Sequence, residues 1–272
     1  MSEQAARRPV GDAEARTANR TWWDAEAEDY YAEHGTFLGD SDFVWGPEGW
    51  TEAELGLLDL SPGLTVLEIG AGAAQCSRWL ARHHEVSVVA SDLSIGMLRT
   101  GARVSRGSAG SVPAVPLVQC DGVTLPFGDG TLDRVFTAYG VMPFVADSEA
   151  VLREAARVLR PGGRFVFSTS HPVRWAFLDD PGERGLTATT SYFDRTPYVE
   201  STGEVVTYAE HHRTIGDLVR QVVGAGLVLT DLVEPEWPDR NTATWGGWSP
   251  LRGGLLPGTA ILVTHKPGRV IR

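Results

Sequence analysis

The chain has 272 residues, with 35 Asp and Glu against 24 Lys and Arg and a formal net charge of −11. This length is enough for one large domain with a sizeable core, and the acidic balance argues against a nucleic-acid partner. Two cysteines, Cys76 and Cys120, predict a reducing cytoplasm and are too few for a disulfide framework or a structural zinc site. No run of 18 apolar residues and no signal-peptide core occur, so we expect a cytoplasmic protein without a membrane partner.

Residues 1–50 are predicted to form a mobile tail and an N-terminal helical cap. Residues 1–18 are polar and rich in Ala and Arg, which favours a mobile segment. Residues 19–33 are predicted as a helix that either lies on the domain surface or closes over a ligand. Its aromatic side chains are Trp22, Trp23, Tyr30 and Tyr31. Residues 35–50 are predicted as a loop with further aromatic anchors.

Residues 51–272 are predicted as one α/β domain organised around residues 64–72. The apolar run that begins this stretch is typical of a parallel strand buried on both faces. Gly70 and Gly72 follow the strand, and a helix is predicted over residues 73–82. Glycines let a ligand approach the backbone, and the helix N-terminus offers free N–H groups. The pattern therefore indicates a nucleotide-binding turn.

Two carboxylates indicate which nucleotide binds there. Asp92 ends the next apolar run 20 residues after Gly72, where a carboxylate would accept both ribose hydroxyls. Glu68 lies two residues before Gly70 and would repel a pyrophosphate but attract an ammonium and a sulfonium. The third glycine of the dinucleotide fingerprint is also missing, because Ala74 stands there. These features favour S-adenosylmethionine (SAM) and disfavour an NAD-linked oxidoreductase.

Two further strands are predicted over residues 115–120 and 132–138. Asp121-Gly122 follows the first at the carboxyl edge of the sheet, where open α/β sheets bind ligands. Asp121 could accept an adenine amino group there, or the pair could be a simple turn. Asp147 is predicted to cap a helix that packs on the sheet.

The ordered motifs of this chain resemble those of class I SAM-dependent methyltransferases over about residues 60–170. They are Glu68-Ile-Gly-Ala-Gly72, Asp92, Asp121-Gly122 before Leu125-Pro126-Phe127, and Leu159-Arg-Pro-Gly-Gly163. The resemblance implies a Rossmann-like, seven-stranded mixed sheet with helices on both faces and an antiparallel last strand. It also implies a SAM site formed by Glu68, Gly70, Ala71, Gly72, Asp92, Leu93, Asp121, Gly122, Tyr139 and Tyr31. Ala74 departs from the family pattern at the third motif glycine.

Two long segments follow the fifth predicted strand, residues 164–169. Residues 171–210 exceed a standard connection and are predicted as an inserted lid that contains a strand pair. Residues 234–258 are rich in Gly and Pro and are predicted as an aromatic loop that forms a wall of the substrate site. Its tryptophans are Trp237, Trp245 and Trp248.

Three histidines are candidates for catalysis, although methyl transfer can proceed by alignment alone. His171 is the first, because it follows the fifth strand and is expected to face the cleft. His211 and His212 begin a predicted helix, residues 211–225, that returns toward the pocket. A structural role is an equal alternative for each. No His or Cys spacing indicates a metal.

The predicted function is methyl transfer from SAM to a small molecule, at an oxygen, nitrogen or carbon that the residues do not identify. RNA or protein methylation is an alternative, disfavoured by the acidic charge and the aromatic lids. A protein that uses SAM without catalysis is a second alternative. The oligomeric state is left open.

Overall fold

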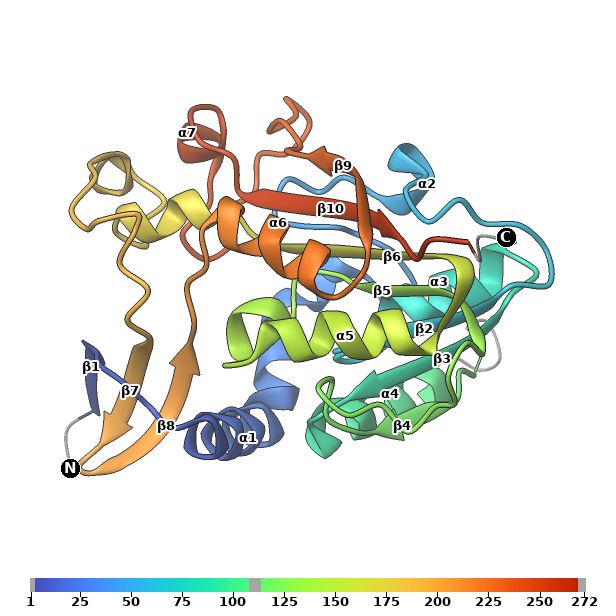
Figure 1. Ribbon diagram of the computed structural model, residues 1–272. Helices are drawn as coiled ribbons and strands as arrows, with labels where there is room; N and C mark the ends of the chain where they lie inside the picture. The colour runs from blue at the N-terminus through green and yellow to red at the C-terminus, as the bar shows by residue number, and fades with distance from the viewer. Residues whose placement is uncertain (1–2, 108–113, 269–272) are drawn as a thin grey trace.

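A seven-stranded sheet runs through the centre of the molecule, with helices on both faces (Figure 1). The computed structural model describes residues 3–107 and 114–268. The strand order is β4-β3-β2-β5-β6-β10-β9. The first five strands pair in parallel, whereas β10 runs antiparallel to both β6 and β9. The predicted α/β class and the antiparallel last strand are confirmed.

The elements of this domain have the following bounds. The strands are β2 (Thr65–Ile69), β3 (Ser87–Asp92), β4 (Leu117–Gln119), β5 (Leu132–Thr137), β6 (Leu159–Ser170), β9 (Val228–Val233) and β10 (Thr259–His265). The α-helices are α2 (Glu52–Leu55), α3 (Gln75–His83), α4 (Ile95–Gly107), α5 (Ser148–Val158), α6 (Ile215–Gly224) and α7 (Pro250–Gly253). Short 3₁₀ helices are η1 (Met142–Phe144), η2 (Pro172–Ala176) and η3 (Glu183–Leu186).

The core has two layers because successive side chains of a strand point to opposite faces. Leu67 of β2 packs in the cluster that also contains Val151 of α5 and Leu218 of α6. Val66, one residue earlier, packs in the other cluster with Leu80 of α3. The strand is therefore buried on both faces, as its apolar run predicts. Its carboxyl end carries the glycine turn to one edge of the sheet.

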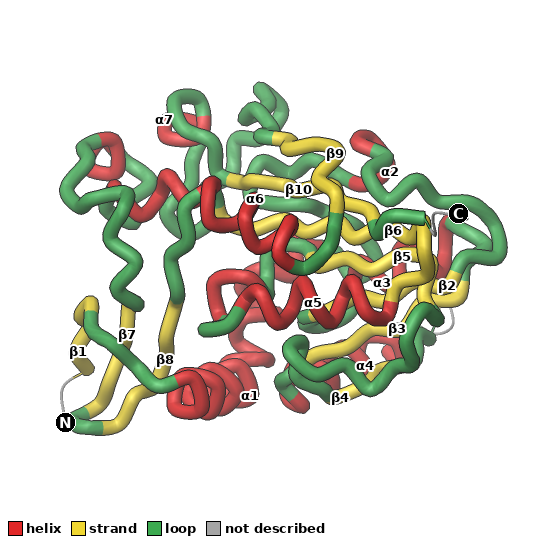
Figure 2. Tube along the Cα trace, in the orientation of Figure 1, coloured by secondary structure: helices red, strands yellow, loops and turns green. Residues whose placement is uncertain are grey.

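The N-terminal segment contains a strand that was not predicted. Residues Glu3–Arg7 form β1, which pairs antiparallel with β7 (Tyr198–Thr202), and β7 pairs with β8 (Val205–Glu210). Figure 2 shows this three-stranded sheet set apart from the main sheet. The structure thus gives residues 3–7 a strand that pairs with β7, and helix α1 (Asp12–Leu38) follows. The mobility of this segment stays a prediction.

Helix α1 is fixed at two points along its length. The Asp24 carboxylate accepts hydrogen bonds from Ser94 Oγ at 2.7 Å and from Gly96 N at 2.9 Å, at the start of α4. The Asn19 side chain bonds both the N–H and the carbonyl of Ala209 in β8, at 2.8 and 2.9 Å. The helix thus joins the main domain to the inserted hairpin and stands across the carboxyl edge of the sheet.

Candidate active site

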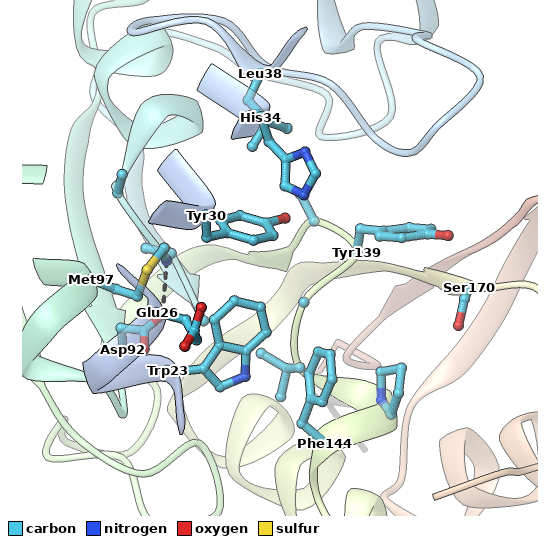
Figure 3. Close-up of a pocket in the computed structure, with 18 of the residues that line it drawn as sticks. Trp23, Glu26, Tyr30, His34, Leu38, Asp92, Met97, Tyr139, Phe144 and Ser170 are labelled. Atoms are coloured by element: carbon cyan, nitrogen blue, oxygen red, sulfur yellow. Dashed lines mark hydrogen bonds between the residues drawn. The ribbon is translucent and has the colours of Figure 1, made fainter. Parts of the chain in front are cut away.

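A cavity of about 540 Å³ lies at the carboxyl edge of β2, β3 and β5 (Figure 3). Helix α1 forms one wall, and the turn between β2 and α3 forms the floor. The inserted segment and the loop around Trp245 line further sides. Residues from four distant parts of the chain therefore share one cavity, which is partly open to solvent.

The turn between β2 and α3 depends on left-handed backbone at three positions. Gly70, Gly72 and Ala74 have φ angles of 67°, 54° and 62°. A Cβ on Gly70 would lie 2.2 Å from Val141 Cγ2, so a side chain there would collide with the opposite wall. Ala74 takes the place of the third motif glycine and keeps the same conformation, at a local cost of about 1–2 kcal/mol. The turn therefore retains its shape without that glycine.

Glu68 is a buried carboxyl group on the cavity wall. Its Oε2 accepts hydrogen bonds from Ser77 N at 3.0 Å and from Ser77 Oγ at 2.5 Å. Burial raises the pKa of Glu68 to about 7, and the two Ser77 bonds and the Arg78 guanidinium only partly oppose that rise. A cation bound in the cavity would stabilise the ionised form.

Asp92 joins the glycine turn to the loop after β3. Its Oδ2 accepts a hydrogen bond from Gly72 N at 2.8 Å, and its Oδ1 accepts one from Ser94 N at 2.7 Å. Burial raises the pKa of this carboxyl group. At the neighbouring edge, the Asp121 carboxylate lies 3.0 Å from Arg16 Nε of α1. Both acids line the cavity and keep further lone pairs for a ligand.

All ten residues predicted for the cofactor site line this one cavity. They are Glu68, Gly70, Ala71, Gly72, Asp92, Leu93, Asp121, Gly122, Tyr139 and Tyr31. Tyr31 comes from α1 and bonds Asp40, whereas the others lie on the sheet edge. Their individual contacts with a cofactor stay predictions.

Aromatic side chains surround the space beyond these residues. Figure 3 shows Trp23 and Phe144 below the opening and Tyr30 and Tyr139 beside it. Tyr139 has a φ of 66°, unusual for a bulky residue, and its ring centroid lies 5.2 Å from that of Trp245. This conformation, found at the end of β5, turns the Tyr139 ring into the cavity. Such strain is most often found at functional sites.

The inserted segment contributes a charged cluster to the same cavity. Arg174 of η2 bonds Glu210 Oε2 at 2.9 Å and Asp179 Oδ2 at 3.2 Å. The Tyr208 hydroxyl donates to Glu210 Oε1 at 2.6 Å. The side chains of Arg174 and Glu210 are 17% and 14% exposed, so water screens their interaction weakly. This polar end of the wall can form hydrogen bonds with a polar group on a ligand bound between the aromatic rings.

The three histidines predicted for catalysis do not line the cavity. His171 was expected to face the cleft, and this expectation is wrong. Its Nδ1 accepts a hydrogen bond from Val173 N at 3.1 Å, so its Nε2 carries the proton and donates to Glu234 Oε1 at 2.8 Å. The chain turns into η2 directly after His171, and the ring bonds Glu234 instead of lining the cavity.

His211 and His212 lie in the loop before α6, which begins at Ile215 after Thr214 caps it. His212 Nε2 bonds the Tyr192 carbonyl at 2.7 Å. Burial lowers the pKa of His211 to about 4, and its Nε2 has no hydrogen-bond partner. The His212 ring contacts the rings of Trp175 and Tyr192, whereas His211 lines a small separate pocket with Thr169 and Ser170 of β6.

His34 is a cavity residue that the sequence reasoning missed. It lies on α1 one turn after Tyr30, and the two ring centroids are 4.4 Å apart. The predicted helix ended at Glu33, so His34 fell outside it. The four-residue spacing from Tyr30 would have placed both rings on one helix face if the helix had been extended.

The described ranges 3–107 and 114–268 contain no group of His, Cys, Asp and Glu residues able to hold a metal ion. Within the same ranges, no helix is long and apolar enough to cross a membrane.

Comparisons with known proteins fit this geometry. A family model described as a methyltransferase domain matches residues 67–167. The chain is 32% identical to a demethylmenaquinone methyltransferase of Mycobacterium bovis, over 81% of this chain and 82% of that protein. It is 41% identical to another of Corynebacterium urealyticum, over 46% of this chain and 50% of that protein. A SAM-dependent methyltransferase structure from Mesorhizobium loti superposes with a TM-score of 0.62 at 23% identity, covering 81% of this chain and all of that one. The chain belongs to the class I SAM-dependent methyltransferases and is an enzyme that takes its methyl group from SAM.

Proposed function

We propose that the enzyme methylates a small, planar aromatic acceptor that carries a hydrogen-bonding substituent. The observation that carries this proposal is the aromatic enclosure beyond the cofactor residues, closed at one end by Arg174 and Glu210. Stacking on aromatic faces suits a flat ring, and the charged pair offers one donor and one acceptor to a substituent.

We place SAM at the opposite end of the cavity. Asp92 accepts the ribose hydroxyls, Asp121 lies beside the adenine, and Glu68 faces the cationic methionine portion. Oppositely charged groups favour each other in a shielded site, and the turn at Gly70 and Gly72 lets the cofactor approach the backbone. The sulfonium methyl group then points toward Tyr139 and the aromatic space.

The charge of the cavity argues against a polyanionic acceptor such as RNA. Arg174 is the one Lys or Arg side chain among the described lining residues, and two carboxylates already bind it. The carboxylates that line the same cavity are Glu26, Asp29, Glu33, Glu68, Asp92, Asp121, Asp179 and Glu210. A phosphate group would meet this negative field without a free cation, so a neutral acceptor fits better.

The mycobacterial relative is named for demethylmenaquinone, and a reduced quinone ring belongs to the acceptor class proposed here. The acceptor atom stays open, because oxygen, nitrogen and carbon nucleophiles on such a ring would all fit. We also propose a cytoplasmic location, since Cys76 and Cys120 are free thiols.

The test is transfer of isotopically labelled methyl from SAM to a panel of acceptors. The panel contains 1,4-naphthohydroquinone, 1-naphthol, naphthalene, spermidine and bulk transfer RNA. We expect label in the hydroxylated rings, and NMR of the product identifies the methylated atom. Asp92→Ala serves as the cofactor-site control, and Asp231→Ala, an exposed carboxylate on β9, serves as the surface control. Label in spermidine or RNA alone would overturn the proposal.

A further inference from the structure

One imidazole projects into the cavity and has no hydrogen-bond partner among the residues that the structure describes. The chain has seven histidines, all within the described ranges, and His34 is the one that lines the cavity. Figure 3 shows its ring extending from α1 toward the space between Tyr30 and Tyr139. Its contacts are edge-on ring contacts, with Tyr30 at 4.4 Å and with Trp245 at 5.7 Å between centroids. Both ring nitrogens are therefore free to bond a ligand.

We propose that His34 is the general base of the reaction and takes the proton that the acceptor loses. The proposal rests on the proposed function, an acceptor that carries an O–H, N–H or C–H bond at the methylated position or beside it. The acceptor atom forms a bond to the methyl carbon as the carbon–sulfur bond breaks, and that electron pair stays on sulfur, giving S-adenosylhomocysteine. The acceptor's proton moves to the free nitrogen of His34 and then to water, because the ring is only partly buried.

The aromatic contacts hold His34 where this step needs it. Tyr30 and Trp245 restrict the ring from two sides, and Trp245 in turn contacts Tyr139 at the end of β5. That strand end is the part of the sheet edge toward which we place the sulfonium. His34 therefore borders the aromatic space where the acceptor would lie, on the wall formed by α1.

The protonation state of His34 agrees with this role. Burial lowers its pKa, which Glu33 on the same helix partly opposes, so the ring is neutral at neutral pH. Tyr30 contacts the ring and Tyr139 lines the same cavity, and burial raises the pKa of both hydroxyls, that of Tyr30 to about 12. Neither tyrosine competes as a base. His171 cannot serve, because both of its nitrogens are already bonded.

The experiment is the pH dependence of kcat in His34→Gln, using the acceptor from the panel with the highest wild-type rate. General-base assistance is typically worth about 100- to 10,000-fold in rate, so we expect kcat to fall at least about 100-fold. The wild-type rate should fall on acidification below the ordinary histidine pKa of about 6.5. This acid limb should disappear in the variant, while the SAM dissociation constant changes less than about twofold. His83→Gln, an exposed histidine at the end of α3, is the matched control.

Three results would overturn the assignment. The first is a His34→Gln rate within a few-fold of wild type, and the second is an acid limb that persists in the variant. The third is a loss of SAM affinity as large as the loss of rate, which would make His34 a cofactor ligand. If the enzyme does not methylate aromatic acceptors, the wild-type protein will methylate only spermidine or RNA. The pH dependence of kcat is then measured with that acceptor.

A second measurement does not depend on the folding of a variant. In wild-type protein labelled with ¹⁵N-histidine and saturated with S-adenosylhomocysteine, 1-naphthol should shift the ring resonance of His34 and leave that of His83 in place. Tryptophan fluorescence reports binding of the naphthol independently. Binding without a shift at His34 would refute its contact with the acceptor.

Discussion

Binding of SAM should release a proton from Glu68. Burial holds the pKa of this carboxyl at about 7, so the ligand-free enzyme is about half protonated there at pH 7. The pKa of Glu68 is higher in the folded protein than in the unfolded chain, so the protonated carboxyl stabilises the ligand-free fold. This stabilisation is lost as pH rises through 7. A sulfonium and an ammonium in the cavity favour the carboxylate instead.

The number of protons released depends on the pKa of Glu68 in the ligand-free enzyme and on its pKa in the SAM complex. If bound SAM returns the pKa of Glu68 to its ordinary value of about 4.3, about half a proton leaves at pH 7 and about nine-tenths at pH 6. The contribution of Glu68 to SAM affinity should then fall about eightfold between pH 7.5 and pH 6. S-Adenosylhomocysteine lacks the sulfonium charge and should release less.

Titration calorimetry at pH 7 measures the release directly. The heat of SAM binding should differ between phosphate and imidazole, which have different ionisation enthalpies, and the difference gives the number of protons. Glu68→Gln should remove that difference, whereas Glu204→Gln in the exposed turn between β7 and β8 should keep it. Equal wild-type heats in the two buffers would refute the raised pKa or the contact with the cation.

Three further perturbations test the site and its frame. Asp92→Ala should weaken SAM binding about tenfold or more in calorimetry, since a charged hydrogen bond is worth about 1.5–3 kcal/mol; unchanged affinity would refute its role, and Asp231→Ala is the control. Gly70→Ala should abolish SAM binding. Gly56 has a similar positive φ and open space around it, so Gly56→Ala should add backbone strain of about 1–3 kcal/mol and lower only the melting temperature. Burial lowers the pKa of His211 in the folded protein to about 4, so His211 destabilises the fold as pH falls from about 6.5 to 4. His211→Gln should therefore make the melting temperature decline less over that pH range. An unchanged slope would contradict the lowered pKa.

The sheet and the cofactor residues were predictable because their signals are local. Apolar runs mark the strands, and in a parallel sheet their carboxyl ends meet at one edge. Glu68, Asp92 and Asp121 each lie within two residues of the end of such a run, so their positions along the chain predicted their place at the cavity. The same reasoning identified residues 171–210 as an insertion, since no ordinary connection is that long.

The strand at residues 3–7 was not predictable, for the opposite reason. The composition of residues 3–18 is typical of a tail, and strand β1 forms only because β7 offers a free edge. That partner lies in the insertion, far along the chain. Pairing of this kind is absent from any local pattern, whereas the helix around Trp23 could be recognised from its own residues.

His171 and His34 show the difference between predicting the position of a residue in the fold and predicting the direction of its side chain. The end of β6 placed His171 at the correct edge of the sheet, but the direction of its side chain depends on the turn at Pro172 and on Glu234 in another loop. His34 shows the converse, because its distance from every motif hid it while helix α1 carries it across the cavity. A position along a strand predicts an edge, and only the packed structure predicts which side a ring faces.

The insertion performs two tasks that are structurally coupled. Its β8 strand bonds Asn19 of α1 through Ala209, and the next residue, Glu210, binds Arg174 at the polar end of the cavity. The position of β8 that fixes α1 therefore also fixes Glu210, whose pair with Arg174 would bond the acceptor. His34 lies on the same helix, so α1 carries both the contact with β8 and the proposed base. The proposed acceptor contact and the proposed base therefore both depend on α1 and the inserted hairpin, which pack at the sheet edge where we place the cofactor.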